Sequence, residues 1–294
     1  MKQPPLPGFV PPDKKIVNVA SVKHRSPFRY PGGKTWLVPR IRQWLQSLPP
    51  NKRRIFIEPF AGGAIVGLTV AFEQLAEQVI LIELDKQVAA VWQTIINTED
   101  GEWLAQRIQS FEMTPENVEM LLAQKNTTLH ERAFQTIVRN RINRGGILAP
   151  GAGKMKHGEA GKGLASRWYP NTLSRRILDI VSIRERLRFI QGNALEIIPQ
   201  YAQEADAVFF IDPPYTAAGK NPGHRLYTHS ELDHEHLFSL MAEVKGHFLM
   251  TYHDEQQVRN LAAKFRFETR TIAMKNTHHA EQTELLIARN FDWL

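Results

Sequence analysis

Short apolar segments alternate with helical patterns between residues 55 and 96, and this alternation constrains the fold more than any other feature. A strand is expected at 55–57, and a glycine-rich turn leads from it to an apolar helix over 64–75. A second strand is expected at 79–84 and a second helix at 87–96. This βαβα alternation predicts a parallel sheet with helices on both faces, in which ligands bind at the carboxyl ends of the strands.

The alternation stops and later resumes, which suggests an insert within the sheet domain. Residues 101–187 show helical patterns and no strand pattern, and the strand pattern returns at 188. A hairpin is expected near the carboxyl terminus, with 265–273 against 284–290. The sequence therefore predicts three parts. They are an N-terminal arm (1–25), a sheet domain in two segments (26–100 and 188–294) and a mostly helical insert (101–187).

Composition excludes several classes of protein. The chain has 294 residues, 43% of them hydrophobic, and can bury a substantial core. It has no cysteine, which excludes disulfides and cysteine-ligated zinc sites. No run approaches the ~18 apolar residues of a membrane-spanning helix, and the first residues lack the apolar stretch of a signal peptide. We expect a cytoplasmic protein without a metal, because the eleven histidines form no evident ligand set.

Positive charge is concentrated in two zones. The net charge is +7, yet residues 139–188 alone carry +9 and residues 1–40 carry +7, so the rest of the chain is acidic. Two basic zones on an acidic body indicate a polyanionic partner, although a solvated surface remains open. Seven glycines lie within 145–163 among several lysines, and this pattern predicts a mobile basic loop.

The most informative motif is Asp212-Pro213-Pro214-Tyr215, which follows the apolar run 207–211. A carboxylate at a strand end and the backbone carbonyl of Pro213 can accept the two hydrogens of an exocyclic amine. The lone pair of that amine is thereby drawn toward the geometry needed to attack a methyl group. Tyr215 offers a flat face on which a base can stack, and such stacking contributes about 1–3 kcal/mol of binding free energy. An ordinary turn that ends a strand is the alternative.

Two segments upstream complete a family pattern. Residues 28–34 read Phe-Arg-Tyr-Pro-Gly-Gly-Lys, and residues 56–64 read Phe-Ile-Glu-Pro-Phe-Ala-Gly-Gly-Ala. Together with 212–215, in this order, they resemble the Dam-type, or D12 class, DNA adenine N6-methyltransferases over residues 26–294. The resemblance implies a class I Rossmann-like methyltransferase sheet with an inserted DNA-recognition domain. It also implies S-adenosylmethionine as cofactor and adenine N6 in double-stranded DNA as the target, reached by base flipping.

The resemblance also implies a set of site residues. The catalytic residues would be Asp212, Pro213 and Tyr215. The cofactor-binding residues would be Tyr30, Lys34, Phe60, Gly62, Gly63, Glu83, Asn193 and Asp212. An acid at the end of the second strand suits ribose hydroxyls, and the family alignment favours Glu83 over Asp85, which could instead cap a helix. Asn193 stands where the family commonly has Asp, and its amide oxygen can still accept a hydrogen bond.

The insert carries a shorter resemblance. Asn140-Arg141 with Gly146 is similar to the family's Asn-Arg segment that leads to a DNA-contacting hairpin. The expected DNA-binding residues are Arg139, Asn140, Arg141, Asn143, Arg144, Lys154, Lys156 and Lys162. Each of these can hold a phosphate or read a base, so the recognition sequence stays open, with GATC one possibility.

Two other functions remain open from the sequence. One is an RNA or protein amine methyltransferase on the same fold, and the other is a catalytically idle DNA-binding protein. We expect a monomer, and the biological setting, including restriction-modification, is not fixed by the residues.

Overall fold

A computed structural model describes residues 22–50, 54–125, 127–155, 158, 161, 163–214, 232–275 and 281–294. Three predicted site residues, Tyr215, Lys156 and Lys162, lie outside the described residues, as does most of the predicted N-terminal arm. Within the described ranges, no helix has the length and apolar character needed to cross a membrane.

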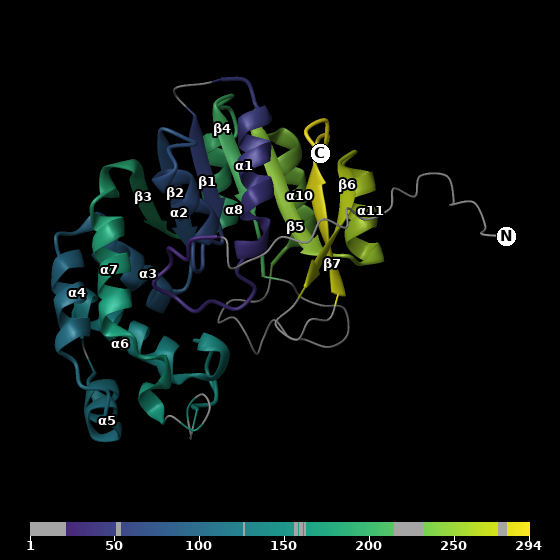
Figure 1. The fold of residues 1–294 in the computed structure, drawn as a ribbon. Helices are drawn as coiled ribbons and strands as arrows, with labels where there is room; N and C mark the ends of the chain where they lie inside the picture. The colour runs from purple at the N-terminus through teal and green to yellow at the C-terminus, as the bar shows by residue number, and fades with distance from the viewer. Residues whose placement is uncertain are drawn as a thin grey trace.

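The centre of the molecule is a seven-stranded sheet with the order β3-β2-β1-β4-β5-β7-β6 (Figure 1). The first five strands in this order are parallel, and β7 is antiparallel to both of its neighbours. This confirms the predicted class I Rossmann-like methyltransferase sheet. The strands are β1 (Ile55–Pro59), β2 (Gln78–Glu83), β3 (Leu187–Gln191), β4 (Ala207–Ile211), β5 (His247–His253), β6 (Glu268–Lys275) and β7 (Glu281–Ala288).

The strand order reverses at β1, and this fixes where a ligand can bind. Ile55 of β1 pairs with Gln78 of β2 on one side and with Ala207 of β4 on the other. The connections that leave the carboxyl ends of β1 and β4 therefore diverge to opposite sides. In open sheets of this kind the crevice at such a switch point is the usual ligand site.

Helices cover both faces of the sheet. They are α1 (Val38–Ser47), α2 (Ile65–Phe72), α3 (Lys86–Trp92), α4 (Gly101–Ser110), α5 (Pro115–Ala123), α6 (Leu129–Ile142), α7 (Pro170–Val181), α8 (Ala194–Ile197), α10 (His234–Glu243) and α11 (Gln256–Lys264). The helix expected at 87–96 is α3 continued by a π-helix, Gln93–Asn97. The helix expected to reach residue 187 ends at Val181. The arginine-rich residues after it form a 3-10 turn, because β3 already begins at Leu187.

The two faces of the sheet have separate hydrophobic cores. Phe56 of β1 packs with α1, α2 and α3, whereas its neighbour Ile57 packs with α8, α10 and α11. The alternation follows from the two-residue period of a strand. Helices α4 to α7, which form the predicted insert, gather beyond β3 in Figure 1. Their buried residues, such as Leu104 and Phe134, belong to the same cluster as Phe56, so the insert shares a core with the sheet domain.

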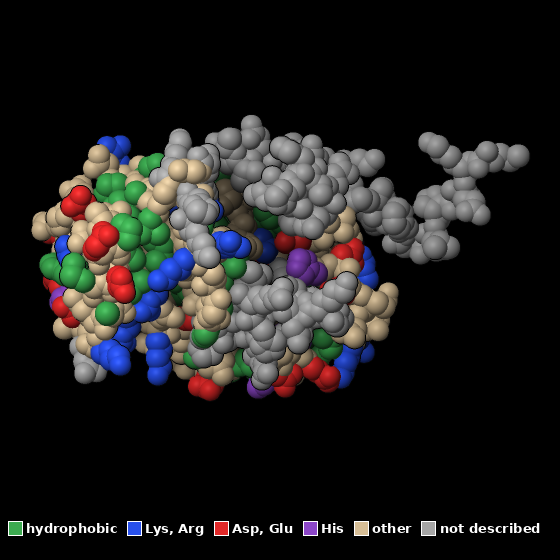
Figure 2. Space-filling model, turned by 90° about the horizontal axis from the view of Figure 1, so that it is seen from below, with side chains coloured by type: hydrophobic (Ala, Val, Ile, Leu, Met, Phe, Trp, Pro, Cys, Tyr) green, Lys and Arg blue, Asp and Glu red, His purple; other side chains and the backbone are tan. Residues whose placement is uncertain are grey.

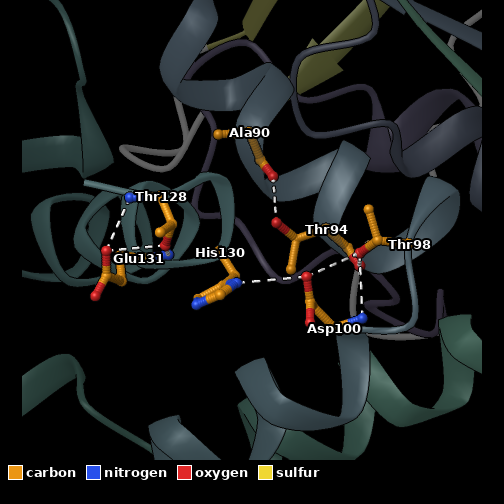
Figure 3. A network of polar contacts seen from close by, with 7 residues as sticks. All are labelled: Ala90, Thr94, Thr98, Asp100, Thr128, His130 and Glu131. Carbon is orange, nitrogen blue, oxygen red and sulfur yellow. Dashed lines mark hydrogen bonds and ion pairs between the residues drawn. The ribbon is translucent and has the colours of Figure 1, made fainter. Parts of the chain in front are cut away.

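A polar network joins the predicted insert to the π-helix (Figure 3). Thr98 Oγ1 donates to the carbonyl of Thr94 at 3.0 Å, and the backbone N–H of Asp100 donates to Thr98 Oγ1 at 3.1 Å. Asp100 Oδ2 lies 3.4 Å from Nδ1 of His130 on α6. Thr128 and Glu131 form a capping box that starts α6. These contacts fix the beginnings of α4 and α6 relative to the sheet.

Candidate active site

A cavity of about 290 Å³ lies at the carboxyl ends of β1, β2 and β4. This volume is close to the lower end of the range of small-molecule pockets, roughly 300 Å³ and above. Figure 2 views the molecule from this side, and the face is hollowed near its centre, with Lys and Arg side chains beside the hollow. All eight predicted cofactor-binding residues line it. They are Tyr30, Lys34, Phe60, Gly62, Gly63, Glu83, Asn193 and Asp212.

The loop after β1 forms one wall of the cavity. Phe60, Gly62 and Ala64 have φ angles of 60°, 47° and 49°, so three of five consecutive residues are left-handed. A Cβ atom at Gly62 would lie 2.5 Å from Cε1 of Tyr30, and this close approach requires glycine. The indole N–H of Trp92 donates to the carbonyl of Gly62 at 2.9 Å and holds the loop from behind. The backbone is thus turned so that its groups face the cavity.

Glu83 connects this loop to the end of β2. Its Oε2 accepts from the backbone N–H of Gly62 at 2.9 Å, and its Oε1 accepts from Leu84 and Asp85 at 2.8 and 2.9 Å. Burial raises the pKa of Glu83, while the N–H groups of Asp85 and Gly62 oppose the rise. A carboxylate oxygen accepts two hydrogen bonds, so Oε2 retains capacity for one more donor.

Asp85 has a different role. Its Oδ1 accepts from the backbone N–H groups of Gln87 and Val88 at 2.7 and 3.2 Å, which makes it the N-cap of α3. The helix-cap alternative raised for this residue is therefore correct. Asn193 likewise caps α8, because its Oδ1 accepts from the N–H of Leu195 at 3.1 Å.

Asp212 extends from the end of β4 into a buried ionic cluster. Lys34 Nζ lies 2.9 Å from Asp212 Oδ1 and 3.6 Å from Oε1 of Glu284 on β7. The hydroxyl of Thr251 on β5 donates to the same Asp212 oxygen at 2.8 Å. The Lys34 and Glu284 side chains are 3% and 4% exposed, whereas that of Asp212 is 23% exposed and lines the cavity. The structure thus brings together two predicted residues and adds two that the sequence analysis missed, Thr251 and Glu284.

Two more carboxyl groups are buried close to Asp212. Burial raises the pKa of Glu58 to about 8, and the charge of Asp212 adds to that rise. Burial also raises the pKa of Glu284 to about 7; Lys34 opposes the rise, and Asp212 adds to it. Glu284 stands directly before the apolar Leu285-Leu286-Ile287 of β7. An acid directly before an apolar strand segment is the sequence signal by which Glu284 could have been found.

Three predicted DNA-binding residues are buried and bind backbone groups of the protein itself. Asn140 has 0% exposure: its Oδ1 accepts from the N–H of Arg29 at 2.9 Å, and its Nδ2 donates to the carbonyls of Arg29 and Gly146. Arg141 is buried and donates to the carbonyl of Pro27. Asn143 is buried as well, and its Nδ2 donates to the carbonyl of Ile147 at 2.7 Å. These assignments are corrected. The last turn of α6 and its C-cap Asn143 direct these side chains inward, where they bind backbone groups.

Arg144 and Lys154 are exposed on a hairpin-like segment. The N–H of Arg144 donates to the carbonyl of Gly153 at 2.9 Å, and the N–H of Met155 donates to that of Ile142 at 2.9 Å. The predicted mobile loop is therefore tied across its described first part. Arg139 is half-buried, with its guanidinium 2.7 Å from the side-chain oxygen of Gln87 on α3.

The sequence model of the D12 class N6 adenine-specific DNA methyltransferase family matches residues 30–275. The chain belongs to this family. The match spans the loop at Tyr30, the glycine turn, the insert and Asp212. This D12-class chain is thus a methyltransferase, and its family implies use of S-adenosylmethionine.

Other comparisons add little about the substrate. A sequence comparison with curated proteins gives no match. The fold is similar to that of the rRNA methyltransferase aviRa from Streptomyces viridochromogenes, with 12% identity and a TM-score of 0.38 over 88% of this chain and 86% of that one. It is also similar to that of precorrin-6y C5,15-methyltransferase from Geobacter metallireducens, with 7% identity and a TM-score of 0.35 over 84% and 86%. At TM-scores below 0.5, neither likeness bears on the activity of the D12-class chain. No group of three or more metal-ligating side chains occurs among the residues that the structure describes.

Proposed function

We propose that the protein transfers the methyl group of S-adenosylmethionine to adenine N6 in double-stranded DNA, with the target base flipped out of the helix. The observation that carries this proposal is the environment of Asp212. Its carboxylate lies at the end of β4, is fixed on Oδ1 by Lys34 and Thr251, and lines the cavity at the switch point of the sheet. An acceptor held in this way needs no rearrangement when the amine arrives.

The cavity residues fit the cofactor. When bound, S-adenosylmethionine supplies a sulfonium methyl group that an amine can attack. The left-handed loop with Gly62 and Gly63 allows close approach of its backbone to a ligand, and Tyr30 and Phe60 wall the same space. Glu83 Oε2 has the remaining acceptor capacity that a ribose hydroxyl requires. We assign Asn193 to the adenine side of the cofactor and Lys34 to its methionine side.

The chemistry at the target amine follows from Asp212 and Pro213. Asp212 would accept one N6 hydrogen and the Pro213 carbonyl the other. Pro213 keeps that carbonyl in place because its ring fixes φ. As the N6–methyl bond forms, the bond from that methyl group to sulfur breaks and its electron pair stays on sulfur. The amine then loses one proton, and Asp212 is the nearest proposed acceptor. We expect Tyr215 to stack on the flipped base, offsetting the few kcal/mol that flipping costs.

Contacts to DNA are assigned to the basic zone at 139–188, which carries a net charge of +9. Arg144 and Lys154 are exposed, and Gly146, Leu148 and Ala149 between them line the cavity. We propose that they hold backbone phosphates, with Lys156, Lys162 and Arg139 in support. We propose a monomeric cytoplasmic enzyme that uses no metal.

A labelling experiment tests the substrate. The protein is incubated with methyl-labelled S-adenosylmethionine and equal amounts of duplex DNA, RNA and unrelated protein, and digested products are identified by mass spectrometry. We expect N6-methyladenine in duplex DNA alone. Label in RNA or protein would support the amine methyltransferase alternative, and DNA binding without cofactor binding would support an idle protein. Methylation-sensitive sequencing of the product would then give the recognition site and test GATC.

A further inference from the structure

Glu284 is a buried carboxyl group that the reaction described above does not use. It lies on β7, where its register partner on β5 is His253 and its partner on β6 is Ile272. Its Oε1 is 3.6 Å from Lys34 Nζ, and the same ammonium is 2.9 Å from the Asp212 carboxylate. Glu284 Oε2 is buried without a hydrogen-bond partner among the described residues. Burying a carboxyl group in such a place costs free energy unless the charge is paired, and Lys34 is the cation that pairs with it.

Two carboxylates that share one ammonium retain one net negative charge. If Lys34 faced Asp212 alone, its charge would cancel that of Asp212 and weaken Asp212 as a hydrogen-bond acceptor. With Glu284 ionised, the ammonium is shared, and the cluster keeps a negative charge beside the place where the amine becomes positive. Electrostatic stabilisation at the site of developing charge is a large term in catalysis.

We propose that Glu284 is a positioning residue that holds Lys34 between two carboxylates and thereby leaves the Lys34–Asp212–Glu284 cluster with one net negative charge beside the target amine. Since this role presupposes methyl transfer at Asp212, it rests on the proposed function. The role adds to that function a residue of β7, outside the cavity lining, that affects the rate of methyl transfer.

The titratable groups around Glu284 define how its protonation affects the cluster. Lys34 and Asp212 face it from the loop before α1 and from the end of β4, and His253 faces it from β5. Burial lowers the pKa of His253, as does the charge of Lys34, so this imidazole is neutral when Glu284 titrates near pH 7. Glu58 is another buried carboxyl group near Asp212, and burial raises its pKa to about 8.

The rate of methyl transfer tests this role in Glu284→Gln. Single-turnover rates with saturating DNA and cofactor are measured from pH 5.5 to 9. The wild-type rate should rise through about pH 7, where Glu284 loses its proton. The variant should show no rise and should stay roughly 3- to 30-fold below the wild-type plateau, a smaller loss than the ~10²–10³ expected for a group that touches the reacting atoms. Glu268→Gln on β6 is the matched control and should follow the wild type.

A second variant excludes the competing carboxyl group. If Glu284→Gln keeps the rise and Glu58→Gln removes it, the role belongs to Glu58 and the inference is overturned. If Glu284→Gln matches the wild type at every pH, Glu284 is a structural residue only. A wild type that forms no N6-methyladenine at any pH would instead overturn the proposed function.

A measurement without cofactor or DNA covers the case in which Glu284→Gln does not fold. The ammonium signal of Lys34 is followed by ¹H–¹⁵N NMR in the full-length protein with ¹⁵N-labelled lysine, and Lys34→Met assigns it. The wild-type signal should shift with a midpoint near pH 7 and should do so equally in Glu58→Gln. A signal that stays constant between pH 5.5 and 9 would show that Glu284 does not act on Lys34, and the inference would fail even if the enzyme is active.

Discussion

The segment 26–34 is held on its two sides by opposite kinds of electrostatic environment. At its end, Lys34 is buried between the carboxylates of Asp212 and Glu284. Near its start, Arg141 is buried against the carbonyl of Pro27, and the charged groups that lower its pKa, after burial itself, are other arginines. One side holds excess negative charge within the protein, and the other holds excess positive charge.

Under the proposed function, the negative side provides the chemistry and the positive side supports DNA binding. Carboxylates in excess of their lysine leave an acceptor for an amine. A backbone carbonyl does not neutralise the charge of the arginine that binds it. The positive charge that remains favours a polyanion nearby. Arg176 on α7 donates to the carbonyl of Ser26 at 3.2 Å, so the positive side extends over two helices. Asn140 links this side to the hairpin-like segment that bears Arg144.

Removing the acceptor should have the largest effect. Asp212→Ala should lower the methyl transfer rate by about 10²–10³, since one pre-aligned hydrogen-bonding group is lost. DNA affinity and the folded state should be kept, as fluorescence anisotropy and circular dichroism can show. Asp179→Ala, on the surface of α7, is the control and should retain full activity. Residual activity of Asp212→Ala within threefold of wild type would remove Asp212 from the catalytic role.

Removing the Asn140 side chain, which links α6 to the segment 26–34, should mainly destabilise the protein. Asn140→Ala removes three hydrogen bonds, two of them to the backbone of Arg29 and one to the buried carbonyl of Gly146. We expect the free energy of unfolding in urea to fall by about 2–4 kcal/mol. Asn97→Ala, which removes a single bond to the carbonyl of Phe189, should cost about 1 kcal/mol or less. Equal losses in the two variants would mean that Asn140 does not hold the segment.

Substitutions of the two acids at the end of β2, Glu83 and Asp85, should have different effects. Glu83→Ala should weaken S-adenosylmethionine binding, measured by calorimetry, by about tenfold or more, which corresponds to about 1.4 kcal/mol. Asp85→Ala should affect affinity less and should lower stability by about 1 kcal/mol, because Asp85 caps α3. The opposite order of affinities would transfer the ribose contact to Asp85.

Removing exposed positive charge should have the smallest effect of these substitutions. The quantity that it changes is the salt dependence of DNA binding. The double variant Arg144→Ala with Lys154→Ala should reduce the slope of log K against log salt by about 2, since each lost phosphate contact contributes about 0.9. Cognate and non-cognate duplexes should be affected alike. A loss of sequence discrimination at unchanged slope would mean that these side chains read bases.

A matched control for that double variant removes two paired cations. Lys23 lies 3.8 Å from Asp179, and Arg184 lies 2.8 Å from Glu99. Because carboxylates already compensate these charges, Lys23→Ala with Arg184→Ala should leave the salt slope almost unchanged. The two double variants therefore distinguish phosphate contacts from a general change in net charge.

The sheet could be predicted from the sequence because its signals are local. Short apolar runs end at the glycine turn after Pro59 and at Asp212, and parallel strands place both ends at one edge. Glu284 could not be placed, because its approach to Lys34 depends on the insertion of β7 between β5 and β6. A hairpin pattern predicts that β6 and β7 pair but not which of them joins the sheet.

The assignment of Asn140 and Arg141 to DNA failed for a related reason. Asn and Arg are suitable base readers, and sequence alone does not show that their partners are backbone groups of the distant segment 26–31. Asn140 lies 111 residues from Arg29 along the chain, and only the packed structure brings them together. Local patterns thus predicted the cavity wall well and the contacts across the insert poorly.

The most direct test of this division of roles is the single-turnover formation of N6-methyladenine at saturating duplex DNA. Asp212→Asn, which preserves the size of the side chain but removes its charge, should be slower than wild type by about 10²-fold. The double variant Arg144→Ala with Lys154→Ala should react at nearly the wild-type rate, because saturation compensates for weaker DNA binding. A slow double variant together with a fast Asp212→Asn would contradict the account.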